Sequence, residues 1–190
     1  MELFALFIGS TLVSNIILSQ FLGICSFIGV SRKSSSAVGM GGAVVFVIVL
    51  STMITWVIDR LVLVPFGLLF MRTLTFILVI ASLVQFVEMF MKRFMPPLYK
   101  SLGVYLPLIT TNCAVLAVAL LSVEHGMDFV STVVYSFAIS FGYAVVIYLF
   151  STIRERLDVA TTPRGFKGAP IALITATMMA LGFFGFLGLV

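Results

Sequence analysis

Six stretches of this sequence run for roughly twenty residues or more with almost no charged side chain, and these runs constrain the fold more than any other feature. A helix that crosses the hydrocarbon core of a bilayer needs ~20 predominantly apolar residues. The chain is 62% hydrophobic and only 9% charged, and a soluble domain of 190 residues could not bury that much apolar surface. The sequence therefore predicts an all-α integral membrane protein.

The apolar runs predict six transmembrane helices. The predicted spans are Leu3–Ser31, Ser36–Ile58, Thr73–Met91, Ser101–Val123, Phe129–Ile153 and Gly168–Val190. Between the second and third spans lies Leu61–Met71, which is too short to cross the membrane and contains Pro65 and Gly67. We expect this segment to form an interfacial or re-entrant turn.

The basic residues predict the orientation, because cytoplasmic loops carry an excess of lysine and arginine. One side holds nine of them: Arg32, Lys33, Lys92, Arg93, Lys100, Arg154, Arg156, Arg164 and Lys167. The other side holds only Arg60 and Arg72. The first of these sides is therefore expected to be cytoplasmic, with both termini outside. The net charge of +4 comes from these few loop residues and does not suggest binding to nucleic acid.

Two halves of opposite orientation are expected, because three spans are followed by three more. The predicted repeats are residues 1–95 and 96–190. Each contains one of the two cysteines, Cys25 and Cys113, in its first span, and "CSFIGV" after one echoes "CAVLAV" after the other. Inverted repeats that place matched features near the bilayer midplane are a known membrane architecture.

Both cysteine-bearing spans are expected to be interrupted near the midplane. A continuous helix over Leu3–Ser31 would be ~43 Å long at 1.5 Å per residue, against a hydrocarbon core of ~30 Å. Polar residues and glycine interrupt these spans, including Gln20 and Gly23 in the first and Thr111 and Asn112 in the fourth. Such residues are tolerated where a helix breaks and freed backbone groups find new partners. A long tilted helix with ordinary polar contacts is the alternative.

The two cysteines have several possible roles. They can be small buried hydrophobes or, less favourably, a disulfide. They can also ligate a metal, and a Cys₄ iron–sulfur site would then need two more cysteines from either a second copy or a paralogue. Nearby donors, namely Gly23, Thr111 and Asn112, could hydrogen-bond the sulfurs. A Cys₂His₂ zinc site is disfavoured because the only histidine, His125, lies in an external loop.

At "FLGICSFIGVSRK", "LPLITTNCAVL", "IRERL" and "APIALITATMMALGF" the chain resembles the A subunits of Rnf (or Rsx) electron-transport complexes. It resembles, slightly less closely, the E subunits of sodium-pumping NADH:quinone oxidoreductases. The resemblance covers essentially the whole chain and both cysteine motifs. Many of these relatives have Pro or Thr where this chain has Ser26.

The resemblance implies a six-span subunit of an inner-membrane complex, paired with a homologous subunit of opposite topology. Cys25 and Cys113 would hold one [2Fe–2S] cluster together with two partner cysteines. Such complexes move electrons between ferredoxin and NAD and couple this to Na⁺ or H⁺ transport, with flavins and further iron–sulfur centres on other subunits. This chain has no nucleotide fingerprint, so we expect a one-electron relay without a complete active site.

Two other functions fit the composition and topology. A small secondary transporter would also have inverted repeats and broken helices, and it would be indifferent to replacement of the cysteines. A purely structural anchor would allow normal electron flow without them. The intramembrane Glu88 is expected to pair with Lys92 one turn later. Gly39–Gly42 is expected to serve close helix packing rather than nucleotide binding.

Overall fold

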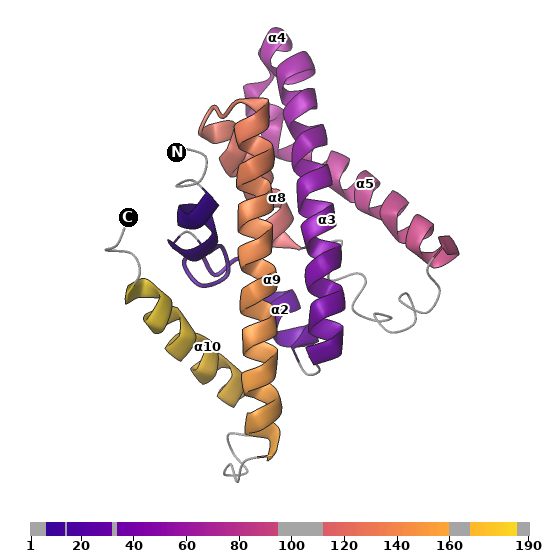
Figure 1. Ribbon diagram of the computed structural model, residues 1–190. Coiled ribbons are helices and arrows are strands. Elements are labelled where there is room, and N and C mark those ends of the chain that lie inside the picture. The colour runs from indigo at the N-terminus through magenta and orange to yellow at the C-terminus, as the bar shows by residue number, and fades with distance from the viewer. Residues whose placement is uncertain (1–6, 14, 32–33, 95–111, 160–167, 186–190) are drawn as a thin grey trace.

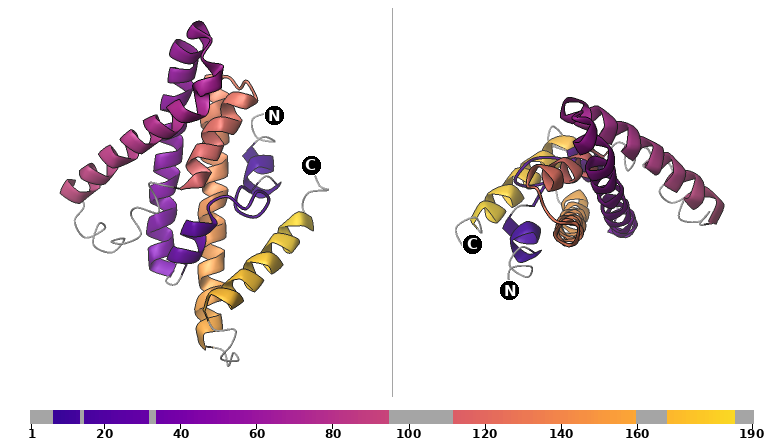
Figure 2. Two further views of the ribbon diagram at one scale, coloured as in Figure 1. Left: turned by 180° about the vertical axis from the view of Figure 1, so that it is seen from behind. Right: turned by 90° about the horizontal axis from the view of Figure 1, so that it is seen from above.

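The computed structural model describes residues 7–13, 15–31, 34–94, 112–159 and 168–185, and every element in these ranges is helical. Its centre is a pair of long helices, α3 (Ser34–Ile58) and α9 (Phe129–Val159), which pack against each other and run antiparallel (Figure 1). α5 (Arg72–Phe94) and α10 (Ala169–Phe184) lean away from this pair on opposite sides (Figures 1 and 2).

Small and hydroxyl-bearing residues allow α3 and α9 to approach closely. A Cβ on Gly41 would lie 3.1 Å from Cβ of Ala144, so the expected packing role of the glycine cluster is confirmed at this position. Buried hydroxyls on the two helices bond back to carbonyls of their own helix, as Thr52 does to Ile48 and Ser140 does to Phe137. The pair therefore buries its polar side chains without leaving most of them unpaired.

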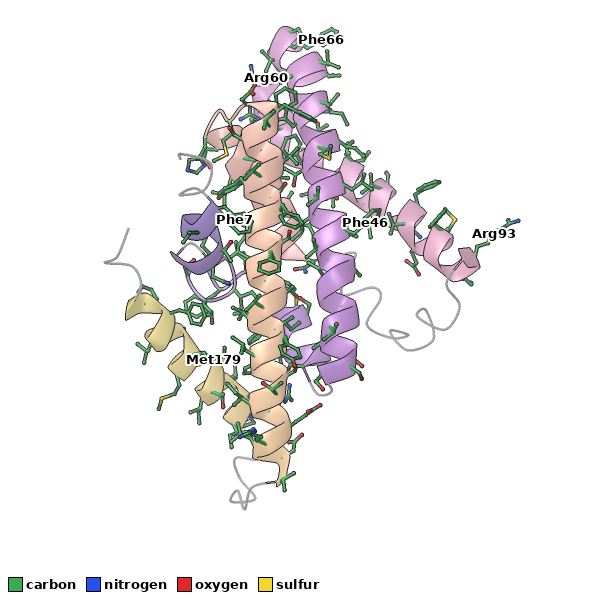
Figure 3. All side chains as sticks on the ribbon, viewed as in Figure 1. Phe7, Phe46, Arg60, Phe66, Arg93 and Met179 are labelled. Carbon is green, nitrogen blue, oxygen red and sulfur yellow. The ribbon has the colours of Figure 1, made fainter. Side chains whose placement is uncertain are left out.

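Much of the outer surface is apolar. Large side chains such as Phe46, Phe66 and Phe86 project away from the helices, and Figure 3 shows two of them with their neighbours. Among the described residues, three helices are long and apolar enough to cross a membrane: Ser34–Phe66, Arg72–Phe90 and Phe129–Val159. Two shorter apolar helices, Cys113–Glu124 and Ala169–Phe184, accompany them. These features identify a membrane protein. That the chain crosses the membrane six times remains a prediction.

The prediction for Leu61–Met71 is wrong for its first six residues. The helical path of α3 continues through a π-helical turn, η2 (Asp59–Leu63), into α4 (Val64–Phe66). A proline in a helix lacks an N–H and clashes with the carbonyl four residues earlier, and the wider π turn before Pro65 accommodates both effects. The chain turns only at Gly67, which has a φ of 65°.

The first predicted span is interrupted, as expected, so the tilted-helix alternative is wrong there. A short π-helix, η1 (Gly9–Val13), is followed by turns and then by α2 (Ile24–Val30). In the second half, α8 (Cys113–Glu124) starts after Asn112, whose backbone is extended. Residues 95–111 lie outside the described part of the chain.

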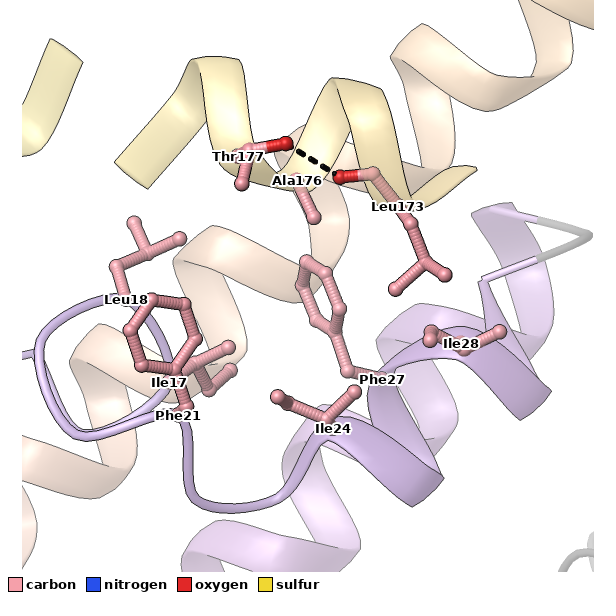
Figure 4. A pocket seen from close by; sticks show the side chains of 9 residues that line it. All are labelled: Ile17, Leu18, Phe21, Ile24, Phe27, Ile28, Leu173, Ala176 and Thr177. Carbon is pink, nitrogen blue, oxygen red and sulfur yellow. Dashed lines mark hydrogen bonds between the residues drawn. The ribbon is translucent and has the colours of Figure 1, made fainter. Parts of the chain in front are cut away.

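The interrupted segment is held between α9 and α10. Gly142 of α9 lets η1 approach so closely that a Cβ there would lie 2.7 Å from the carbonyl oxygen of Thr11. On its other side the segment contacts α10 around a small apolar cavity of about 70 Å³, lined by residues such as Phe21, Phe27 and Leu173 (Figure 4). The break between η1 and α2 is therefore a packed part of the fold.

Candidate metal centre

Both cysteines lie in the first turn of a helix. Cys25 is the second residue of α2, which follows Gly23, and Cys113 is the first residue of α8, which follows Asn112. From the middle of the molecule α2 runs toward one end and α8 toward the other, so their N-termini meet (Figures 1 and 2). N-terminal turns carry free N–H groups and a partial positive charge, which favour thiolates and other anions.

Gly23 joins the two helix starts. Its backbone N–H donates a hydrogen bond to Sγ of Cys113 at an N···S distance of 2.9 Å. Its φ of 90° and ψ of 14° lie in the left-handed region, which favours glycine. A Cβ there would lie 3.2 Å from Cε2 of Tyr143 and 3.3 Å from Oδ1 of Asn112. Both the backbone conformation and the crowding therefore require glycine.

Asn112 caps α8 and keeps one donor free. Its Oδ1 accepts a hydrogen bond from the N–H of Ala114 at 3.1 Å, which fixes the orientation of the amide. Its Nδ2 is buried and has no hydrogen-bond partner in the described part of the chain. An unsatisfied buried donor costs about 1–3 kcal/mol, so an acceptor placed against Nδ2 would relieve this penalty.

The two thiols differ in exposure and are not joined. Cys25 is exposed and Cys113 is partly buried, and neither forms a disulfide. Within the described ranges no three His, Cys, Asp or Glu side chains gather where they could hold a metal ion. This chain thus presents two thiols. The N–H of Gly23 contacts Sγ of Cys113, and the unpaired Nδ2 belongs to Asn112, the residue before Cys113. The remaining predicted donor, Thr111, lies outside the described residues.

The structure adds one residue to the site, Tyr143, that the sequence does not indicate. Tyr143 of α9 is completely buried, and its hydroxyl lies 2.8 Å from Oγ of Ser26. It is also within electrostatic reach of both cysteines. Sequence spacing gives no signal for Tyr143, because only the packing of α9 against α2 and α8 brings it to the site.

The sequence places Arg154 among the loop charges, and the structure shows that this prediction is wrong. Arg154 belongs to α9 and is only 5% exposed. Its Nη1 donates to the carbonyl of Ile28 at 2.7 Å and to Oγ of Ser31 at 2.8 Å, at the C-terminal end of α2. The neighbouring Glu155 accepts a bond from the N–H of Ser34, the first residue of α3. Helix α9 therefore holds both ends of the helix that carries Cys25.

Together, these features define a helical membrane protein that presents two free thiols at opposed helix N-termini. The family model described as "Rnf-Nqr subunit, membrane protein" matches residues 3–190. The chain belongs to the Rnf-Nqr family, as the sequence motifs predicted.

Several relatives are similar over their whole length, and three of them are named as the A subunits of ion-translocating oxidoreductase complexes. The chain is 53% identical to the one from Serratia proteamaculans, over 100% of this chain and 98% of the relative. It is 54% identical to the one from Cronobacter sakazakii, over 97% and 96%. It is 52% identical to the one from an Azoarcus species, over 99% and 97%.

Proposed function

We propose that this chain is the A-type membrane subunit of an Rnf-type ion-translocating oxidoreductase complex. In this role it relays electrons through a [2Fe–2S] cluster that it shares with a homologous subunit. The names of the relatives support the first part of the proposal. The observation that carries the second part is the hydrogen bond from Gly23 to Sγ of Cys113, which brings the two cysteine-bearing helix starts to one place.

The residues at the site fit such a cluster. When bound, a [2Fe–2S] cluster accepts and releases one electron at a time, and Cys25 and Cys113 would supply half of its four ligands. The N–H of Gly23 and the free Nδ2 of Asn112 would donate hydrogen bonds to sulfur. The first turns of α2 and α8 would stabilise its negative charge. Cys25, which is exposed, would face the partner subunit.

We infer that the chain has six spans in two inverted three-helix repeats, residues 1–95 and 96–190. The antiparallel packing of α3 and α9 supports this arrangement, as does the divergence of α5 and α10 on opposite sides (Figures 1 and 2). The opposed directions of α2 and α8 fit the same relation. A homologous partner of opposite topology would then meet the chain at its cysteines.

The location that we propose is the inner membrane of a bacterium, with both termini on the outer side. Arg154 and Arg156 lie near the C-terminal end of α9. Arg60 lies at the opposite end of the molecule (Figure 3), and Arg72 is paired with its neighbour Asp59. The first end would face the cytoplasm by the positive-inside rule. Flavins and further iron–sulfur centres would belong to other subunits of the complex.

The test is low-temperature electron paramagnetic resonance (EPR) of the dithionite-reduced chain, purified anaerobically with its homologous partner. We expect a [2Fe–2S] signal and about two iron ions per pair of subunits. Cys25→Ala and Cys113→Ala should each abolish both. Ser140→Ala, which removes a buried hydroxyl bonded within α9, should preserve them. An iron-free wild-type pair that is fully assembled would overturn the cluster proposal and favour a transporter.

A further inference from the structure

A chain of hydrogen bonds connects α9 to the turn that contacts Cys113. Oγ of Ser26 donates to the carbonyl oxygen of Gly23 at 2.9 Å, and the same Oγ lies 2.8 Å from the hydroxyl oxygen of Tyr143. Ser26 and Tyr143 are both completely buried. No water is needed to complete this chain, because each link is a direct contact.

The direction of each bond follows from the number of protons. A serine hydroxyl has one proton, and Ser26 gives it to the carbonyl of Gly23. Tyr143 must therefore be the donor in its bond with Ser26. The hydrogen bonds therefore run from the Tyr143 hydroxyl to Ser26 and from Ser26 to the carbonyl of Gly23. The N–H of Gly23 in turn donates to Sγ of Cys113.

These hydrogen bonds constrain the backbone of Gly23, whose N–H contacts Sγ of Cys113. Gly23 adopts a left-handed conformation, with freedom that few other residues have, and its N–H reaches Cys113 only if that conformation persists. One face of Gly23 is closed by the ring of Tyr143, whose Cε2 would lie 3.2 Å from an added Cβ. Tyr143 thus restrains Gly23 both by direct packing and through Ser26.

We propose that Tyr143 and Ser26 are positioning residues that hold the N–H of Gly23 on Sγ of Cys113 and would thereby tune the reduction potential of a cluster that Cys113 ligates. The effect on the potential rests on the proposed function, since it requires the bound cluster. A donor to sulfur stabilises the reduced state, which carries more negative charge, and raises the potential. Loss of either hydroxyl should therefore lower it.

The primary experiment is an EPR-monitored redox titration of the assembled subunit pair with Tyr143→Phe and Ser26→Ala. We expect each variant to keep its iron. The equilibrium constant for reduction should fall by up to about tenfold, which corresponds to a fall of about 59 mV in the one-electron reduction potential. Ser26→Thr retains a hydroxyl and should restore the wild-type potential. Tyr135→Phe removes the same atom elsewhere on α9, from a side chain that is 9% exposed, and should not change it.

A second measurement does not depend on the cluster. In the metal-free full chain with Cys25→Ser, the alkylation rate of Cys113 reports its thiolate character. Tyr143→Phe should slow this reaction severalfold, and Tyr135→Phe should not. If the wild-type pair holds no cluster, the proposed function fails, and slower alkylation still supports the positioning role. Unchanged potentials in both hydroxyl variants, or unchanged alkylation, would overturn it.

Discussion

Gly23 is subject to two separate constraints at the residue scale. Its φ of 90° is strained for any residue with a side chain, and its surroundings leave little space for a Cβ. Gly67 has a similarly positive φ of 65° but has no atom within 4 Å of the position that a Cβ would take. The two glycines therefore allow backbone strain to be separated from crowding at the cysteine site.

We expect Gly23→Ala to lower both thermal stability and iron content, whereas Gly67→Ala lowers stability alone. The left-handed conformation costs about 1–2 kcal/mol for a non-glycine residue, and this term is common to both variants. Only at Gly23 does the new methyl group push on Tyr143 and Asn112. Thermal unfolding in detergent and iron analysis of the purified pair would measure the two effects. Equal iron loss in both variants would contradict this explanation.

The residues around Cys113 are partly predictable from the sequence. Gly23 and Asn112 can be identified because helix-breaking and capping residues beside a membrane cysteine have few other uses. In the sequence, Ser26 is notable only because many relatives have another residue at this position. Nothing in the sequence points to Tyr143. Their pairing depends on how α9 packs across α2, and local sequence carries no information on that contact. Arg154 is misplaced for a similar reason, since its partners are carbonyl groups that sequence patterns do not reveal.

Helix α2 is only seven residues long, too short to be stable by itself, so its position depends on contacts at the element scale. Its N-terminal end is held by the contacts of Gly23 and Ser26, and its C-terminal end by Arg154. A cation at the C-terminus of a helix also interacts favourably with the helix dipole. Arg154 therefore orients the helix that carries Cys25 without contacting the cysteine.

Arg154→Met should destabilise the chain by about 2 kcal/mol or more, because hydrogen bonds from a charged donor contribute about 1.5–3 kcal/mol. For a chain of this size that corresponds to a fall in melting temperature of roughly 4–8 °C. Arg156→Met removes an exposed guanidinium from the same helix and should change the melting temperature little. Similar losses in both variants would show that charge, rather than the contact with α2, is responsible.

Gly142 permits a close approach of η1 to α9. Gly142→Ala should lower the melting temperature, because its Cβ would lie 2.7 Å from the carbonyl oxygen of Thr11 and overpacking costs about 1–3 kcal/mol. The matched control is Gly182→Ala in α10, where a Cβ has no neighbour within 4 Å. Thermal unfolding of the two variants side by side would test the contact. A melting temperature for Gly142→Ala at or above the wild-type value would refute it.

The end of the second span shows why element boundaries are harder to predict than elements. Pro65 and Gly67 both suggest a turn, but only Gly67 makes one. The proline is absorbed by the π-helical turn of η2, whose Asp59 is buried and paired with Arg72 at 2.8 Å. The ion pair links the end of α3 to the start of α5 and neutralises a buried carboxylate. A sequence pattern cannot distinguish a proline that ends a helix from one that widens it.

At the scale of the whole molecule, Arg60 follows the end of α3, whereas Arg154 and Arg156 lie near the end of the antiparallel helix α9. Composition and run length are enough to predict membrane residence and the long central helices, because burial in lipid makes hydrophobicity itself the signal. The interrupted segment is predictable from its excess length. The mutual tilt of α5 and α10 is not, since tilt depends on packing against neighbours.

The predicted orientation leads to a labelling experiment. In a chain with both cysteines replaced by serine, Arg60→Cys should react with a membrane-impermeant maleimide in cells whose outer membrane has been made permeable. Arg156→Cys should react only in inverted vesicles, because it lies on the side rich in basic residues. Labelling of both positions from one side would contradict the orientation.

The exposure of Cys25 has a consequence for how the cell makes this protein. A copy that has not met its partner carries an accessible thiol at Cys25, and the buried amide nitrogen of Asn112, the residue before Cys113, lacks an acceptor among the described residues. Such a copy is open to oxidation and to capture of unsuitable metals. Under the proposed function, the relative synthesis rates of the two homologous subunits would determine how many copies are lost in this way. Balanced expression of the pair would then be a requirement for growth under oxidative stress.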